Sequence, residues 1–335
     1  MSNWILRGLY RALRGALCAV GAVALLLAAL VATPLTQPPE MHSVSESPNG
    51  IDFSNLPAVE RFQARDGTML GFRHYAPSGP ATGRGAIFIH GSSGSSGTVN
   101  HALSAALAAR GVETWAIDIR GHGASGTRGD IGYVGQLEDD LADFVAFIRN
   151  TTPDLPLTLI GHSAGGGFAL RVAGSPMQGL FVRTVLLAPY LGYDAPTNRP
   201  HSGGWASADV PRMLGLFALR KFGINCCEAL PTLAFAVPPN SENILVPVYS
   251  DRLMRNFATA GYRTDLAAAT RPLTIISGAD DEMMLADKYA EAAHAVAPSV
   301  DVKLIGGVNH MGIVSVPKAV SAVADDVATR GIGQS

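Results

Sequence analysis

The chain is poor in cysteine and in charged residues, and each shortage excludes a class of protein. Three cysteines among 335 residues are too few for a disulfide framework. Two of them, Cys226 and Cys227, are adjacent, so they could pair only as a strained ring, and the redox compartment stays open. Charged residues make up 16% of the chain and the formal net charge is -2, which gives no support to nucleic-acid binding.

Patterns that hold metals or dinucleotides are missing as well. Neither H-E-x-x-H nor C-x-x-C occurs in the sequence, so we predict no metal site. A G-x-G-x-x-G pattern is absent after the first apolar strands, so no dinucleotide and no other cofactor is expected. What the chain does have is 47% hydrophobic residues, enough for one large α/β domain with an insertion.

The most informative segment is 161–165, which reads Gly-His-Ser-Ala-Gly around Ser163. The apolar residues 157–160 before it predict a buried strand, and the small residues 165–167 after it open a predicted helix. A strand, a sharp turn and a helix are the setting in which G-x-S-x-G exposes a nucleophilic hydroxyl. The pentapeptide alone is equally compatible with a Gly/Ser loop.

A second apolar strand, over 85–89, runs into a His-Gly turn at 90–91. In this position a hydrolase needs a backbone N–H that points at the oxyanion, and Ser92 would supply it, with Ala164 as the second donor. The alternatives are a phosphate loop or an inserted linker. A phosphate loop requires Lys-Ser/Thr after its last glycine, whereas Thr98 follows Gly97 here.

Two further predicted strands end in polar loops. One ends at Gly278 and is followed by Asp280, Asp281 and Glu282, and the other precedes His310. A serine, an acid and a histidine therefore occur in that order along the chain, which is the order of α/β-hydrolases. Since the carboxyl ends of parallel strands meet at one edge, we expect these side chains to share a site.

With these residues and the segment 116–125 (Ala-Ile-Asp-Ile-Arg-Gly-His-Gly-Ala-Ser), the chain resembles a known family. The segment is similar to the D-x-R-G-H-G-x-S loop of α/β-hydrolases of the monoacylglycerol lipase, lysophospholipase and serine aminopeptidase group. Their G-H-S-x-G-G motif occurs here at 161–166. The resemblance covers roughly residues 59–330, apart from 192–265. It implies the α/β-hydrolase fold, with a mostly parallel central sheet, helices on both faces and an inserted cap.

The resemblance also implies roles for individual residues. Ser163 would be the nucleophile, His310 the general base and Asp281 the acid that orients it, because the family's acid usually lies three residues after the strand-end glycine. Asp280 is the neighbour that could be confused with that acid, and Glu282 is expected to be solvated. His90 and His122 are expected to support loops rather than carry protons.

The N-terminus carries a separate signal. Residues 15–33 contain no charge, Arg7, Arg11 and Arg14 precede them, and no Lys or Arg follows until Arg61. This length and charge bias predict an uncleaved signal-anchor in residues 1–33 with the body on the extracytoplasmic side. A bacterial inner membrane facing the periplasm fits the excess of Arg over Lys. A cleaved signal peptide, giving a secreted or periplasmic protein, and a buried helix are the alternatives.

Residues 34–57 are rich in Pro, Ser and Glu and are expected to form a linker or stalk before a hydrolase domain over 58–335. The proline-rich stretch of about 192–265 would be the cap. Its apolar residues are expected either to line an acyl pocket or only to pack the cap onto the body: Leu214, Leu216, Phe217, Leu230, Leu233 and Phe235.

Together these features predict a serine hydrolase that cleaves carboxylic esters through a Ser-His-Asp triad. The expected substrate is a small molecule with a lipid-like acyl chain, such as a monoacylglycerol or a lysophospholipid, and the expected membrane contact is the N-terminal helix. An aminopeptidase or amidase, or an acyltransferase, would use the same residues. A hydrolase-fold protein that binds a ligand with little turnover is the alternative outside enzymes.

Overall fold

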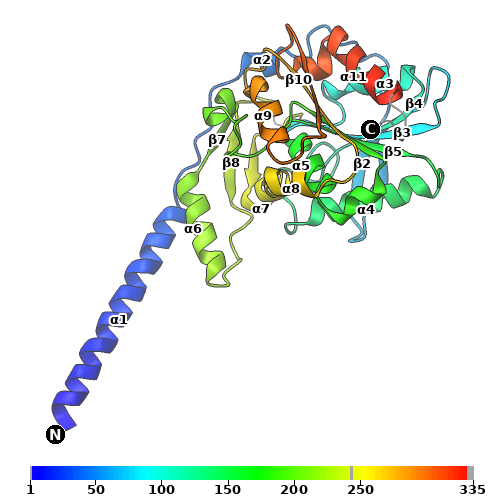
Figure 1. Ribbon diagram of the computed structural model, residues 1–335. Helices are drawn as coiled ribbons and strands as arrows, with labels where there is room; N and C mark the ends of the chain where they lie inside the picture. The colour runs from blue at the N-terminus through cyan, green and yellow to red at the C-terminus, as the bar shows by residue number, and fades with distance from the viewer. Residues whose placement is uncertain (1, 242–243, 330–335) are drawn as a thin grey trace.

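The computed structural model describes residues 2–241 and 244–329, and an eight-stranded sheet forms its centre (Figure 1). The strand order is β1-β2-β4-β3-β5-β6-β10-β11. β2 runs antiparallel to β1 and β4, and the six strands from β4 to β11 in that order run parallel. The strands are β1 (Glu60–Gln63), β2 (Met69–Tyr75), β3 (Arg84–Ile89), β4 (Val112–Ile117), β5 (Leu157–His162), β6 (Arg183–Leu187), β10 (Leu273–Gly278) and β11 (Asp301–Ile305).

Helices cover both faces of this sheet, because successive side chains of a strand point to opposite faces. In β3, Ile87 and Ile89 contribute to one apolar cluster, and Ala86 and Phe88 contribute to another. The first cluster includes α4 (Gln136–Arg149), α5 (Ala164–Ala173), α8 (Tyr262–Ala268) and α9 (Tyr289–His294), and the second includes α3 (Asn100–Ala109), α10 (Gly312–Ser315) and α11 (Pro317–Thr329). The predicted mostly parallel α/β fold is confirmed.

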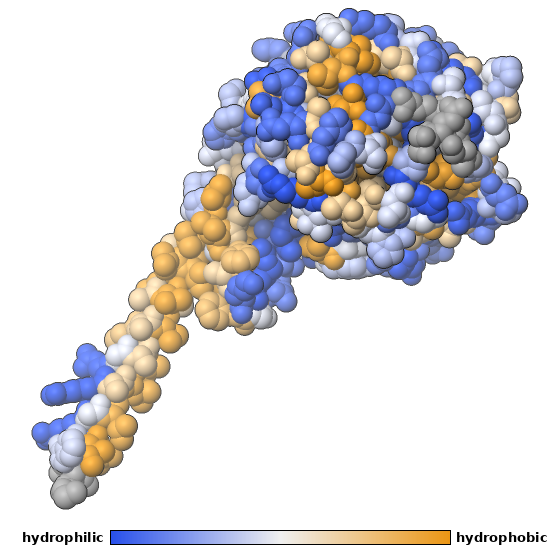
Figure 2. Space-filling model, viewed as in Figure 1, coloured by the Kyte–Doolittle hydropathy of each residue, from blue (hydrophilic) through white to orange (hydrophobic). Residues whose placement is uncertain are grey.

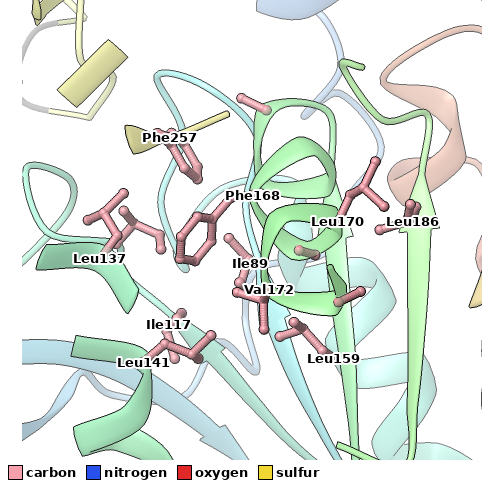
Figure 3. Packing of buried hydrophobic residues seen from close by; sticks show 14 of the residues in the cluster. Ile89, Ile117, Leu137, Leu141, Leu159, Phe168, Leu170, Val172, Leu186 and Phe257 are labelled. Carbon is pink, nitrogen blue, oxygen red and sulfur yellow. The ribbon is translucent and has the colours of Figure 1, made fainter. Parts of the chain in front are cut away.

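Helix α5, which follows Ser163, is held by the first cluster (Figure 3). Phe168 and Val172 of α5 face Ile89 of β3 and Leu159 of β5, and all four are fully buried. Because this core is close-packed, the N-terminus of α5 has little freedom to move relative to the strand ends.

The cap lies between β6 and β10, where the proline-rich stretch was expected. Besides short helices it contains a three-stranded antiparallel sheet with the order β7-β8-β9. Its elements are η2 (Pro200–Gly204), β7 (Ala206–Ala208), α6 (Val210–Lys221), β8 (Pro231–Phe235), β9 (Val248–Ser250) and α7 (Asp251–Asn256). Two short 3₁₀ segments complete the body: η1 (Pro176–Leu180) and η3 (Ala286–Lys288).

The N-terminal helix α1 (Ser2–Val31) projects from the body, and α6 of the cap lies beside its C-terminal part (Figure 1). The Arg212 side chain of α6 donates to the carbonyl oxygens of Val31, at 2.9 Å, and of Thr33. The Thr33 hydroxyl donates to the carboxylate of Asp209 at 2.8 Å. The end of α1 is thus fastened to the cap by polar contacts.

Residues 34–57, which were expected to form a linker or stalk, lie against the body. After α1 the chain runs past β7 and β8 to the short helix α2 (His42–Ser45), and it stays against the body (Figure 1). The N–H of Met41 donates to the carbonyl oxygen of Ala236 at 3.0 Å, and the Met41 and Val44 side chains pack against the core. A few apolar side chains in this Pro/Ser-rich segment attach it to the body, and the composition of the segment did not indicate that contact.

Candidate active site

Ser163 lies at the turn between β5 and α5 with a left-handed backbone (φ 54°, ψ -118°). The two glycines of the motif allow this turn to be tight. A Cβ at Gly161 would lie 2.2 Å from the carbonyl oxygen of Gly165, and one at Gly165 would lie 2.3 Å from that of His90. A non-glycine residue in this region of φ is strained, and such strain is typical of a nucleophile held at a strand-to-helix turn.

His310 and Asp281 form a buried pair beside it. The imidazole Nδ1 of His310 donates to Oδ2 of Asp281 at 2.8 Å, and both residues are at most 2% exposed. Since an ionised carboxylate only accepts hydrogen bonds, Nδ1 carries the proton and Nε2 is left as the acceptor. Of the two candidate acids, Asp281 contacts the imidazole, and Asp280 is exposed.

The charge of Asp281 is stabilised from several sides. Burial alone would raise the pKa of this carboxyl, but His310 and the backbone N–H groups of Met283 and Met284 lower it below its usual value. Both N–H groups donate to Oδ1 at 2.8 Å. An aspartate held ionised at this point keeps the His310 ring in one tautomer and orientation.

Glu282 differs from the sequence expectation, which left it in solvent. Its Oε2 accepts a hydrogen bond from the backbone N–H of His310 at 2.9 Å, and its Oε1 is buried. The carboxylate therefore ties the loop after β10 to the loop that carries His310. The sequence separated Asp281 from its two acidic neighbours by spacing, but it gave no sign of this contact of Glu282.

Ser163 and His310 both line one cavity of about 450 Å³, as does Ser92. The volume lies within the range of small-molecule sites. Ala164 is the first residue of α5, so its N–H belongs to the helix-terminal groups that have no partner inside the helix. The two predicted oxyanion donors thus lie on the two segments, after β3 and after β5, that border the nucleophile.

The loop that carries Ser92 is fixed by residues that the sequence did not single out. Trp205 donates from Nε1 to Oγ of Ser92 at 2.8 Å, and the hydroxyl of Tyr249 accepts from the N–H of Ser93 at 2.7 Å. Asp118 of the D-x-R-G-H-G segment accepts from the N–H of Ser96 at 2.7 Å. The cap and the loop after β4 therefore both support this turn.

Comparisons with known proteins agree with this geometry. Residues 84–221 match the family model described as "Serine aminopeptidase, S33". Human monoglyceride lipase is 31% identical over 153 residues, which is 45% of this chain and 48% of that protein. Monoacylglycerol lipase of Mycolicibacterium smegmatis is 32% identical over 104 residues, covering 31% and 36%. The chain spans half or less of the length of these curated relatives.

The chain has the α/β-hydrolase fold. In sequence it resembles the monoglyceride lipase and serine aminopeptidase group, as predicted. Solved structures share the fold at low identity. A soluble variant of monoglyceride lipase from Saccharomyces cerevisiae has a TM-score of 0.60 at 18% identity, over 84% of this chain and 97% of that one. A bacterial membrane phospholipase A has a TM-score of 0.55 at 16% identity, over 99% of this chain and 100% of that one.

Three other histidines are buried next to the site. His90 contacts its neighbours through both ring nitrogens, with the carbonyl oxygen of Gly91 at 2.7 Å and the N–H of Ile119 at 3.2 Å. His122 contacts the hydroxyl of Tyr249. Burial lowers the pKa of both rings, so they are neutral supports of the loops, as predicted. His162 approaches the carbonyl oxygen of His310, and burial together with the charge of His310 lowers its pKa to about 3.

The apolar cap residues singled out from the sequence do not line the cavity. Leu214 and Phe217 are more than half exposed on α6, and Leu216 and Phe235 are buried in packing. The cap contributes other residues to the cavity, namely Trp205, Pro238, Ser241, Ile244 and Leu245. Periodicity identified a helix here but could not tell which of its faces meets the body and which meets the surroundings.

Proposed function

We propose that this α/β-hydrolase is a membrane-anchored serine hydrolase that cleaves carboxylic esters with an apolar acyl chain. One observation carries the proposal. The hydrogen-bonded pair of His310 and Asp281 lies beside a strained Ser163, and Ser163 and His310 open into the same largely apolar cavity. A nucleophile, a base and an orienting acid in one concave site are the combination that acyl transfer needs.

In the first half of the proposed reaction, Oγ of Ser163 attacks the ester carbonyl carbon. Nε2 of His310 takes the serine proton, and Asp281 stabilises the imidazolium that forms. The carbonyl oxygen becomes an oxyanion and accepts hydrogen bonds from the N–H groups of Ser92 and Ala164. Each such donor contributes about 3–4 kcal/mol to lowering the barrier in comparable enzymes.

In the second half, the C–O bond to the leaving alcohol breaks and His310 returns the proton to that oxygen. This leaves an acyl ester on Ser163. Water then attacks the acyl carbon with His310 as base, and the acid product and free Ser163 are released. Each proton in this reaction is transferred through Nε2 of His310. Asp281 must therefore keep Nδ1 protonated and in place.

The lining of the cavity supports an apolar acyl group. Phe53, Leu56, Val99, Trp205 and Leu245 contribute to it from three separate parts of the chain. The curated relatives are named monoglyceride lipase, and a membrane phospholipase A shares the fold along almost the whole chain. We therefore propose lipid-like esters such as monoacylglycerols or lysophospholipids as the substrate class.

The membrane part of the proposal rests on α1 and α6. Within Trp4–Val31, a window of 18 residues has a mean hydropathy of 2.2, and none of that window is buried (Figure 2). A helix of this length extends about 42 Å, more than the hydrocarbon core of about 30 Å requires. Helix α6 packs against α1, and Leu214 and Phe217 of α6 and Phe222 just after it are each more than half exposed. Their exposure fits a helix that lies against lipid next to an anchor.

We propose that the N-terminus is cytoplasmic and that the hydrolase body lies on the extracytoplasmic face. Arg7, Arg11 and Arg14 precede the uncharged part of α1, and such residues are retained on the cytoplasmic side. Carbonate extraction of membranes should leave the full chain in the pellet. Protease added outside spheroplasts should cleave the body, whereas release of a shortened chain would point to a cleaved signal peptide instead.

The catalytic proposal is tested by an ester and amide panel. The full chain in detergent is assayed with p-nitrophenyl esters from acetate to laurate and with matched p-nitroanilides. We expect ester turnover to rise with acyl length. Ser163→Ala should lower this turnover by several orders of magnitude, because triad residues act as a unit. Faster cleavage of the anilides would favour an amidase, and no turnover of either series would contradict the proposal.

A further inference from the structure

The segment between the membrane helix and the hydrolase body is fastened at both of its ends. At the cap end, the backbone N–H of Met41 donates to the carbonyl oxygen of Ala236, and the side-chain amide of Gln37 donates to that of Phe235 at 3.4 Å. The Met41 side chain packs against the same core that contains Trp205. This end of the segment is therefore attached to the cap by two hydrogen bonds.

The other end is fastened to the body by His101 of α3. Nε2 of His101 donates to the carbonyl oxygen of Asp52 at 3.1 Å, since a carbonyl only accepts, and Nδ1 contacts the hydroxyl of Tyr75 at 3.1 Å. The ring of Phe53 stacks on the same imidazole with a centroid distance of 5.6 Å. Arg73 donates to the carbonyl oxygen of Pro57. Burial lowers the pKa of His101, which keeps this ring neutral.

Between these two attachments the segment forms part of the cavity that contains Ser163. We call its lining residues the linker wall: Val44, Ser45, Ser47, Pro48, Phe53 and Leu56. Four of the six are apolar. The hydroxyls of the two serines donate to carbonyl oxygens of the segment itself, Ser47 to Val44 at 2.6 Å and Ser45 to His42 at 3.4 Å. Their single donors are used locally, so these hydroxyls have no proton left to donate to a polar ligand.

We propose that the linker wall is an acyl-binding surface and that it sets the length of acyl chain the hydrolase accepts. The inference rests on the proposed ester hydrolysis and assigns its specificity to a segment outside the catalytic sheet. An apolar chain attached to the carbonyl at Ser163 enters a cavity of about 450 Å³, and the linker wall forms part of its boundary. The ligand class is a fatty acyl chain, recognised by apolar contact alone.

The size of the effect follows from burial. Each methylene that the cavity removes from water raises kcat/KM about four-fold, until the chain reaches a wall. A bulkier residue in the linker wall should therefore shorten the accepted chain, and a smaller one should lengthen it. A residue of the same segment that faces solvent should do neither.

The test compares three variants of the full chain in detergent: Val44→Trp, Leu56→Ala and the control Glu46→Trp. Glu46 lies two residues from Val44 but is exposed and does not line the cavity. We expect Val44→Trp to lower the ratio of kcat/KM for octanoate to that for acetate at least ten-fold. Leu56→Ala should move the plateau to longer chains, and Glu46→Trp should keep the wild-type profile. Profiles that coincide for all three variants would overturn the inference.

A binding measurement separates failure of the inference from failure of the proposed function. In the Ser163→Ala background, the Kd of 11-(dansylamino)undecanoic acid is followed by its fluorescence. Adding Val44→Trp should weaken binding at least ten-fold, whereas adding Glu46→Trp should not. If wild type hydrolyses no ester, the proposed function fails, and this Kd comparison still decides on the linker wall. Equal Kd values would overturn the acyl-binding surface whatever the activity is.

Discussion

The two sides of the cavity are formed by different kinds of structure: the ends of sheet strands on one side and largely irregular segments on the other. On one side, Ser163, Asp281 and His310 follow the ends of β5, β10 and β11, and they are almost completely buried. On the other side, the linker wall and the cap contribute residues from segments with little regular structure. The first side depends on a close-packed sheet to hold atoms in position, and the second depends on a few fastening contacts. We expect the first side, called the catalytic side below, to determine whether an ester bond is cleaved. We expect the second side to determine which substrates are accepted.

The largest expected effect lies on the catalytic side. Asp281→Asn should lower kcat by about 10⁴, because the amide reverses the hydrogen bond to Nδ1 and favours the wrong tautomer of His310. Asp280→Asn, one residue away and exposed, should lower it less than about three-fold. Steady-state kinetics with a p-nitrophenyl ester measures both. Equal losses from the two changes would remove the distinction drawn between these carboxylates.

Acid should destabilise the catalytic side first. His90, His122 and His162 are buried, and each has a folded-state pKa below the unfolded value of about 6.5. Below pH 6.5 the unfolded chain binds protons that the folded chain does not, so each histidine removes up to about 1.4 kcal/mol of unfolding free energy per pH unit. For His162 this continues down to about pH 3.

Urea unfolding of the full chain in detergent between pH 8 and 4.5 measures this loss. Unfolding free energy should be nearly level above pH 7. Below pH 6.5 these three rings should lower it by up to about 4 kcal/mol per pH unit, and His101, whose pKa is also lowered by burial, adds to the fall. His162→Gln should reduce the slope by at most about a third. A stability that is independent of pH over this range would mean that the three rings are not held neutral.

A smaller effect is expected where the two sides meet. Trp205 of the cap donates to Oγ of Ser92, whose own N–H is a proposed oxyanion donor. Trp205→Phe should lower kcat about 3–10-fold, less than the loss of a donor itself would, because only the positioning of the loop is relaxed. Trp115→Phe makes the same change in β4, away from the cavity, and should leave kcat at the wild-type value. A loss confined to KM would make Trp205 a part of the substrate surface only.

The sequence predicted that Ser163, Asp281 and His310 would share a site, because a sharp strand-to-helix turn and the ends of parallel strands need particular residue types at particular backbone positions. The glycines around Ser163 are required by contacts as close as 2.2 Å, and the order of strands brought Asp281 and His310 to one edge. The spacing after Gly278 selected Asp281 for the contact with His310, but nothing in the sequence showed that Glu282 would accept a hydrogen bond from the backbone N–H of the same histidine.

The opposite side could not be predicted because contact with a cavity imposes no motif. Val44 and Phe53 lie in a segment whose Pro, Ser and Glu content is typical of a stalk, and the contacts of His101 and Ala236 that hold it come from distant parts of the chain. In the cap, Phe217 has the helical spacing of a core residue and yet is about half exposed. Amphipathic spacing shows that a helix has two faces and leaves open what each face meets.

The proposed ester hydrolysis requires Ser163 to be an activated nucleophile, and covalent labelling measures that property directly. The full chain in detergent is treated with a fluorophosphonate, digested, and the modified peptide is identified by mass spectrometry. We predict one equivalent of label, on Ser163, lost in Ser163→Ala and in His310→Ala and retained in Glu46→Trp. A wild-type chain that takes no label, or takes it on another residue, would contradict the account.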